Sequence, residues 1–288
     1  MLKRTSTLTA VLAVAAVLMS VLGCDVSIPT GTTSEGFERT YTEHLEQTLD
    51  GRGASLLDAR TINGAITLEG SAQDRVIVQI RKEIRAFSKQ EAEAFAQKVQ
   101  VHVKRNGNEI QIYKEHPKPP NHIQVVVAYE IQSPSGVDVR LGTVNGRIRI
   151  RGMVGTVDAE TINGAIDLVG GGSRVGLSTV NGDIDALVEP LGGEGRFFAV
   201  NGSVDVEVRS GVAPVTATTT NGSVELTLPG NFSGQLSARA ARGRVRSEFP
   251  MSLPPGSPQN YLTGPLGKGG NTQVTLLTTN GNVALKRR

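Results

Sequence analysis

Four acidic residues recur at nearly even intervals through the middle of the chain. Asp167, Asp185, Asp205 and Glu225 are separated by 18, 20 and 20 residues, and each follows an Asn-Gly pair by three residues. Neighbouring carboxylates repel one another unless a cation or a basic group lies between them, and carboxylate oxygens are the ligands that hard divalent cations prefer. The spacing therefore predicts a candidate strip for a divalent cation or a basic ligand, with a solvated acidic surface as the alternative.

Every copy of the repeat has one residue in this column, three positions after the glycine of its corner. If the repeats stack in register, the acidic row is expected to have an arginine at each end, Arg149 and Arg246, which would partly neutralise it. The whole expected column is Thr67, Arg149, Asp167, Asp185, Asp205, Glu225, Arg246 and Ala284.

The only cysteine of the chain, Cys24, follows a short apolar segment that runs from residue 8 to residue 22. This segment is too short for a comfortable membrane span and is preceded by two basic residues, as in a secretory signal peptide. The sequence Val-Leu-Gly-Cys resembles a bacterial lipobox. We therefore expect residues 1–23 to be a lipoprotein signal peptide and Cys24 to carry lipid, palmitate included. The alternative is an export signal or uncleaved anchor with an incidental cysteine.

The residues after Cys24 bear on location and partners. Asp25 resembles an inner-membrane retention signal, which predicts the periplasmic face of the inner membrane in a Gram-negative cell. Residues 24–36 are rich in Ser, Thr, Gly and Pro and predict a flexible tether. Removal of the signal peptide leaves 28 basic residues against 27 acidic ones. Nucleic acid is therefore not an expected partner, whereas a membrane, an envelope protein or a glycan is.

The Asn-Gly pairs stand inside a repeated template, Thr-x-Asn-Gly-x-Ile/Val, in which apolar and polar residues alternate. This pattern predicts strand, corner, strand. A hairpin meander would use type I′ turns, but it would place Glu160 opposite Asp167, a repulsive pair. In a parallel solenoid, glycine would supply a positive φ and asparagine would tolerate it. We therefore favour an all-β fold, a parallel β-helix or β-solenoid of about 18–21 residues per coil. The predicted corners are Asn63, Gly64, Asn145, Gly146, Asn163, Gly164, Asn181, Gly182, Asn201, Gly202, Asn221, Gly222, Asn280 and Gly281.

The threonine of each template is expected to face the core. Stacked threonines are predicted to exchange hydroxyl hydrogen bonds between neighbouring strands. The column comprises Thr61, Thr143, Thr161, Thr179, Thr219 and Thr278, with Ala199 and Ala240 as smaller substitutes.

Residues 37–288 are predicted to form the solenoid domain, and two segments interrupt its repeat. Residues 65–135 predict a small α+β insert or cap that covers an exposed sheet edge. It contains a capping box that starts at Ser88 and a hairpin at Asn106-Gly107. Residues 247–271 contain five prolines and predict a long loop, which is functional or mobile in many proteins.

The template, the helix-bearing insert and the ending from Leu266 to Leu285 resemble the DUF4097 family, whose members are named putative adhesins. The resemblance covers about residues 37–288. It implies a β-helical repeat fold in a bacterial envelope protein, and the family defines no catalytic residues that could be assigned to this chain. Arg242, which stands where the repeat has asparagine, departs from the pattern and suggests a different arrangement beside the long loop.

These observations together predict a membrane-anchored lipoprotein that displays a solenoid as a binding or structural, adhesin-like module. We expect no enzyme activity, no catalytic residues, no cofactor and no conventional metal site. One alternative is a polysaccharide-acting β-helix enzyme, which a cleft with Asp167, Asp185 or Asp205 beside a basic residue would favour. The other is an envelope-stress accessory protein.

Overall fold

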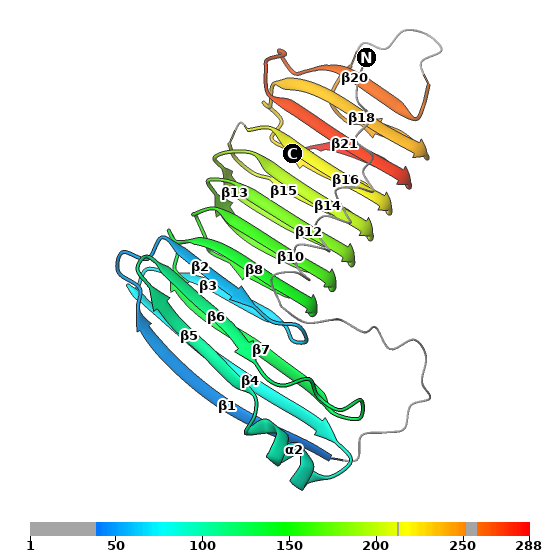
Figure 1. Ribbon diagram of the computed structural model, residues 1–288. Helices are drawn as coiled ribbons and strands as arrows, with labels where there is room; N and C mark the ends of the chain where they lie inside the picture. The colour runs from blue at the N-terminus through cyan, green and yellow to red at the C-terminus, as the bar shows by residue number, and fades with distance from the viewer. Residues whose placement is uncertain (1–38, 212, 252–257) are drawn as a thin grey trace, which may run out of the picture.

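Two long β-sheets face each other along the molecule (Figure 1). The computed structural model describes residues 39–211, 213–251 and 258–288. Each sheet has eleven strands, and most neighbouring strands are parallel and in register. The apolar side chains between the sheets form one continuous core. The predicted all-β solenoid is therefore confirmed, and the hairpin meander is excluded.

A regular coil consists of one strand from each sheet, joined at an Asn-Gly pair. We call the sheet that precedes the corners sheet B and the one that follows them sheet A. The regular strands of sheet B are β2 (Leu56–Arg60), β8 (Asp138–Asn145), β10 (Val157–Asn163), β12 (Val175–Asn181), β14 (Gly195–Asn201) and β16 (Val215–Asn221). Those of sheet A are β3 (Ile66–Ser71), β9 (Ile148–Arg151), β11 (Ile166–Gly172), β13 (Ile184–Leu191), β15 (Val204–Val208) and β17 (Val224–Leu228).

The segment between the first two Asn-Gly corners closes one end of the solenoid. The strand β6 (Glu109–Glu115) lies parallel to β2, and β7 (Gln124–Pro134) lies parallel to β3, so the two form a further coil without an Asn-Gly pair. Antiparallel strands complete this end: β5 (Gln100–Asn106) on β6, β4 (Arg75–Ala86) on β7, and β1 (Arg39–Asp50) on β4.

The predicted helix and hairpin of this segment are both present. Helix α2 (Lys89–Ala96) begins after Ser88, whose hydroxyl accepts a hydrogen bond from the backbone N–H of Glu91 at 3.2 Å. Its buried side chains include Phe95, and the helix packs on β1 and β4. Among the described residues, no helix has the length and apolar character to cross a membrane.

The other end of the solenoid does not follow chain order. The late strands are β18 (Gly234–Arg242), β19 (Val245–Ser247), β20 (Tyr261–Leu266), β21 (Gln273–Asn280) and β22 (Val283–Arg287). The last coil, β21–β22, lies between β16–β17 and β18–β19, and β20 pairs antiparallel with β18. The predicted loop at 247–271 therefore contains an edge strand.

The corner glycines allow the backbones of neighbouring coils to approach closely. A Cβ atom added to Gly164 would lie 1.9 Å from the carbonyl oxygen of Gly146, and the other stacked corners are as tight. Gly182 has a positive φ, but Gly146 and Gly164 do not, and no described residue other than glycine has one. The prediction that the asparagines adopt a positive φ is therefore wrong. What all the stacked corners share is the close packing of their glycines, and not an unusual φ.

The corner asparagines form a continuous ladder of side-chain hydrogen bonds. In each step the amide nitrogen of one asparagine donates to the amide oxygen of the preceding coil's asparagine, at distances of 2.6 to 2.8 Å. The ladder runs through Asn63, Asn145, Asn163, Asn181, Asn201, Asn221 and Asn280.

The stacked threonines do not bond to one another, which corrects that prediction. Each corner threonine donates its hydroxyl hydrogen to a backbone carbonyl of a neighbouring coil, as Thr179 does to Gly164 at 2.9 Å. The path of the chain at the corner brings the glycine carbonyl within reach of the buried hydroxyl. Thr143, Thr161, Thr219 and Thr278 bond to glycine carbonyls in the same way, and Thr61 bonds to the carbonyl of Val127.

Candidate functional site

The four predicted carboxylates lie side by side on the outer surface of sheet A. We call Asp167, Asp185, Asp205 and Glu225 the acidic strip. They stand on the consecutive strands β11, β13, β15 and β17 and are paired in register. The residues on either side of them along each strand are buried in the core, so alternation places the four carboxylates outward.

Basic groups contact the two ends of the acidic strip. The Nε atom of Arg147 lies 2.9 Å from Asp167 Oδ2, and Arg149 Nε lies 3.5 Å from the same atom. No hydrogen bond of good geometry is made to this oxygen, so these contacts are purely ionic. At the other end Lys286 forms an ion pair with Glu225.

Arg246 is not the neighbour of Glu225, contrary to the prediction. Strand β22 lies between β17 and β19, so Ala284 pairs with Glu225 and Arg246 pairs with Ala284. The cation that contacts Glu225 comes from Lys286, two residues further along β22. The predicted neutralisation at this end exists, but a different residue supplies it.

The two carboxylates in the middle of the strip lack such partners. Within the described part of the chain, neither Asp185 nor Asp205 has a side-chain hydrogen bond or an ion pair. Partial burial, followed by the charges of Asp167 and Asp183, raises the pKa of Asp185. Partial burial and the charges of Glu225 and Asp185 raise the pKa of Asp205. The negative charge at the centre of the strip is thus only partly offset, by Arg147 near Asp185 and by Lys286 near Asp205.

The chemistry of the strip favours separate contacts with a basic ligand over chelation of a metal. Carboxylates on neighbouring parallel strands are about 4.8 Å apart, and Asp167 Oδ2 is itself buried. The described residues contain no group of three or more His, Cys, Asp or Glu side chains placed to hold a metal ion. Ammonium or guanidinium groups need no such convergence, because each can pair with a single carboxylate.

A second unusual region lies where the asparagine ladder ends. A cavity of about 410 Å³ is lined in part by Arg244, Arg246, Phe249, Met251 and Tyr261. The two guanidinium groups have no ion pair with any described residue. The departure from the repeat at Arg242-Gly243 was the sequence signal for this region.

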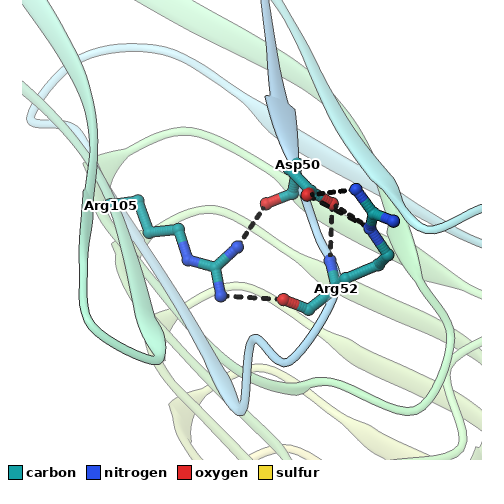
Figure 2. Close-up of polar contacts among 3 residues, drawn as sticks. All are labelled: Asp50, Arg52 and Arg105. Atoms are coloured by element: carbon teal, nitrogen blue, oxygen red, sulfur yellow. Dashed lines mark hydrogen bonds and ion pairs between the residues drawn. The ribbon is translucent and has the colours of Figure 1, made fainter.

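Sequence reasoning missed a clamp at the opposite end of the molecule. Figure 2 shows the Arg105 guanidinium reaching the turn that follows β1, where it donates to the carbonyls of Asp50 and Arg52, both at 2.8 Å. Its Nε also donates to Gly107 at 2.9 Å. The side-chain and backbone hydrogen bonds from Arg52 lower the pKa of the Asp50 carboxyl to about 2. This clamp joins sheets A and B and is structural, and no repeat pattern pointed to it.

The predicted lipidation site, Cys24, lies outside the described residues, as do the signal peptide and the tether at 24–36.

Comparison with known proteins gives distant structural likeness only. No protein-family model and no curated protein matches the chain. A "putative adhesin" from Parabacteroides merdae is 10% identical, with a TM-score of 0.43, covering 87% of this chain and 97% of that one. One from Parabacteroides distasonis is 10% identical, with a TM-score of 0.37, covering 84% and 97%. A "putative lipid binding protein" from the same species is 10% identical, with a TM-score of 0.33 and the same coverage.

Two of these three solved structures are thus named as putative adhesins, and the third as a putative lipid binding protein. At these identities and TM-scores the likeness transfers no function to the chain. The resemblance to the DUF4097 family stays a prediction.

Proposed function

We propose that the chain is an adhesin-like binding module of the cell envelope. In this proposal a lipid on Cys24 anchors the protein to the membrane, and the solenoid presents the acidic strip to a basic ligand. The observation that carries the proposal is the pair Asp185 and Asp205. These two adjacent carboxylates have no described partner, although cations contact both ends of the strip.

The energetic cost of this pair supports a role outside the fold. Like charges opposite each other on neighbouring strands destabilise a sheet, and a raised carboxyl pKa means that the ionised form is disfavoured in the folded protein. Neutral residues at these positions would remove the cost. Groups that cost stability and have shifted pKa values are frequent at binding and catalytic sites.

The ligand class follows from the geometry of the strip. A row of single carboxylates on a flat sheet surface suits a flexible segment that carries several amino or guanidinium groups, such as a lysine-rich peptide. Such contacts are ionic and exposed, so binding should weaken as the salt concentration rises.

The proposal is tested by the binding of an octalysine peptide at low salt, measured by calorimetry. The double variant Asp185→Asn, Asp205→Asn should bind roughly two- to thirty-fold more weakly, because it loses two exposed ionic contacts. The matched control Asp158→Asn, Glu194→Gln removes two charges on the sheet B side. Equal loss in both variants would show a non-specific effect of net charge and would reject the strip.

The anchor is tested separately by fractionation of cells that produce the full chain. Cys24→Ala should move the protein from the membrane fraction to the soluble fraction. An unchanged distribution would reject lipid anchoring and leave the binding result unaffected.

The enzyme alternative has one observation in its favour, the approach of Arg147 and Arg149 to Asp167. These residues lie on the outer surface of a sheet, and neither of the two cavities described contains them. Cleavage of an acidic polysaccharide by the protein, abolished in the Asp185→Asn, Asp205→Asn variant, would favour the enzyme over the binding module.

A further inference from the structure

The long strand β1 has one unpaired edge. It is the outermost strand of sheet A and, among the described strands, pairs with β4 alone (Figure 1). Apart from the Asp50 carbonyl, which accepts a hydrogen bond from Arg105, the alternate backbone N–H and C=O groups on that edge have no partner among the described residues. Such a row is the usual template for pairing with another chain. Helix α2 contacts β1 and β4 but forms no strand pair with that edge.

The core is also incompletely covered along β1. The side chains of Tyr41, Leu45 and Leu49 face inward, opposite Ile84, Ile80 and Val76 of β4. All three remain partly exposed, whereas their partners on β4 are buried. A further strand beside β1 would both satisfy its backbone groups and cover these side chains.

The sequence of β1 is complementary to itself when read in the opposite direction. If two copies pair antiparallel with Leu45 opposite Leu45, then Tyr41 faces Leu49 and Glu43 faces Gln47 on the inner side. On the outer side, Thr42 faces Thr48 and His44 faces Glu46. Apolar residues thus meet apolar residues, and acidic residues meet an amide or an imidazole.

The registers shifted by two residues lose this match. One shift places Glu43 opposite Leu45 and Arg39 opposite Leu49. The other places Glu46 opposite Glu46 and Glu43 opposite Leu49. Both place Glu43, which is paired with Lys82, against a leucine instead of the polar Gln47, and one adds a like-charge pair, so the register centred on Leu45 is favoured.

We propose that β1 is a homodimerisation strand, through which two copies of the chain join antiparallel about a two-fold axis at Leu45. Sheet A of one solenoid then continues into sheet A of the other across the interface. A two-fold contact of this kind is closed, because each edge is used once and no further copies are added. The inference rests on β1 and is independent of the acidic strip and of the lipid anchor.

The register gives a direct cross-linking test on the full-length chain. Residues directly opposite on antiparallel strands have Cα atoms about 4.5–5.5 Å apart, which is within the range of a disulfide. Leu45→Cys should therefore form a disulfide-linked dimer under mild oxidation. In Tyr41→Cys the two cysteines would be about 27 Å apart, so it should cross-link at least roughly tenfold more slowly. The pair Tyr41→Cys, Leu49→Cys should restore cross-linking.

Two controls keep the result interpretable. The unmodified chain measures the background from Cys24. The outward pair Thr42→Cys, Thr48→Cys should also cross-link, and it leaves the core unchanged. If Leu45→Cys fails to fold, this pair tests the proposed register instead. Equal cross-linking of Leu45→Cys and Tyr41→Cys, or none in the folded Thr42→Cys, Thr48→Cys variant, would overturn the proposal.

A charge swap tests the same contact without cysteine. His44→Glu places two glutamates opposite each other at both ends of the pair and should weaken the dimer roughly two- to thirty-fold in sedimentation equilibrium. Adding Glu46→Lys should restore the dimer, because the introduced glutamate of one copy would then face the introduced lysine of the other. Failure of the double variant to recover would contradict the proposed register.

Discussion

The corner glycines differ in backbone conformation but share one steric demand. Gly182 has a φ of 158°, whereas Gly164 has no positive φ. At both positions a Cβ atom would lie within 2.0 Å of the preceding corner's carbonyl oxygen. That oxygen also accepts the hydroxyl of a threonine, as at Gly164 and Thr179. The glycine is therefore required by the stacking itself, whatever its φ.

Replacement of a single corner glycine should therefore be costly. In Gly164→Ala the new methyl group meets the backbone of the preceding coil at Gly146, which cannot move without breaking the ladder. We expect the free energy of unfolding to fall by roughly 3 kcal/mol, measured by urea denaturation. Gly136→Ala is the matched control, because a Cβ atom there meets nothing within 4 Å. Similar losses in both variants would mean that coil stacking is not the cause.

In the acidic strip, by contrast, we expect a substitution to raise the free energy of unfolding. The pKa of Asp205 in the folded protein lies above its ordinary value of 3.8, so its ionised form costs stability at neutral pH. This cost falls as the pH drops through the raised pKa and is gone below the unfolded value. Asp205→Asn should thus stabilise the protein by roughly 0.2–1 kcal/mol at pH 7 and leave it unchanged near pH 3. Lower stability of this variant at pH 7 would contradict the repulsion.

At the scale of elements, the two ends of the solenoid are closed by different means. One end carries helix α2 and the antiparallel strands β1, β4 and β5, and the other carries the single antiparallel strand β20. At the first end the Arg105 clamp links the β5–β6 hairpin of sheet B to the turn after β1 of sheet A. Two sheets that contact each other mainly through side chains are here joined through backbone carbonyls.

Loss of the clamp should loosen this end of the molecule. Arg105→Ala removes three charge-assisted hydrogen bonds and should lower the free energy of unfolding by about 1–3 kcal/mol. Hydrogen exchange should increase in β1 and in the β5–β6 hairpin while the coils beyond β8 stay protected. Arg196→Ala is the control, because its partner Glu194 is local and exposed, and we expect a change below about 0.5 kcal/mol. Uniform exchange across the chain would contradict a local role.

The ion pair between Asp50 and Arg52, which lies beside the clamp, has a defined acid limit. The pKa of Asp50 is lowered to about 2, so its ion pair with Arg52 contributes stability above the ordinary value of 3.8. That contribution is lost as the pH falls from about 4 to 2.

The sequence predicted what repeats locally and missed what depends on distant partners. Alternation around Asn163 was enough for the strand pair and the in-register columns, and the capping box was enough for α2. The asparagine ladder could have been predicted from the sequence, because stacked amides at strand spacing can bond to one another. The clamp made by Arg105 could not have been predicted, since the two carbonyls that it reaches on the other sheet are more than fifty residues away. The end cavity was signalled only by Arg242, where the template fails.

At the scale of the whole molecule, the order of coils is the feature that no local pattern could reveal. The strands β8, β10, β12, β16 and β21 all offer the same inward Val-x-apolar-x-Thr face, so the sequence does not specify which coil stacks on which. Chain order is then the natural expectation, and it placed Arg246 beside Glu225. The structure instead inserts β21–β22 between β16–β17 and β18–β19.

Removal of residues 272–288 should therefore act beyond the deleted segment. In a solenoid built in chain order only the last coil would be lost. Here β18 and β19 lose the strands on which they stack, and β20 is held only by β18. We therefore expect hydrogen-exchange protection to disappear from the strands β18, β19 and β20 as well, while β8 to β15 retain theirs. Full protection of residues 234–266 in the truncated chain would contradict this coil order.

The insertion of β21–β22 also governs the order in which the fold can be completed. A ribosome makes the chain from its N-terminus, so residues 234–266 emerge before the strands that hold them. The coils up to β17 can stack as they appear, but the end of the solenoid must wait for the final segment. A chain that stops early therefore leaves an open sheet edge and unattached strands for proteases to recognise. Because the last coil lies between two earlier ones, the molecule is protected from proteases only after its synthesis is complete.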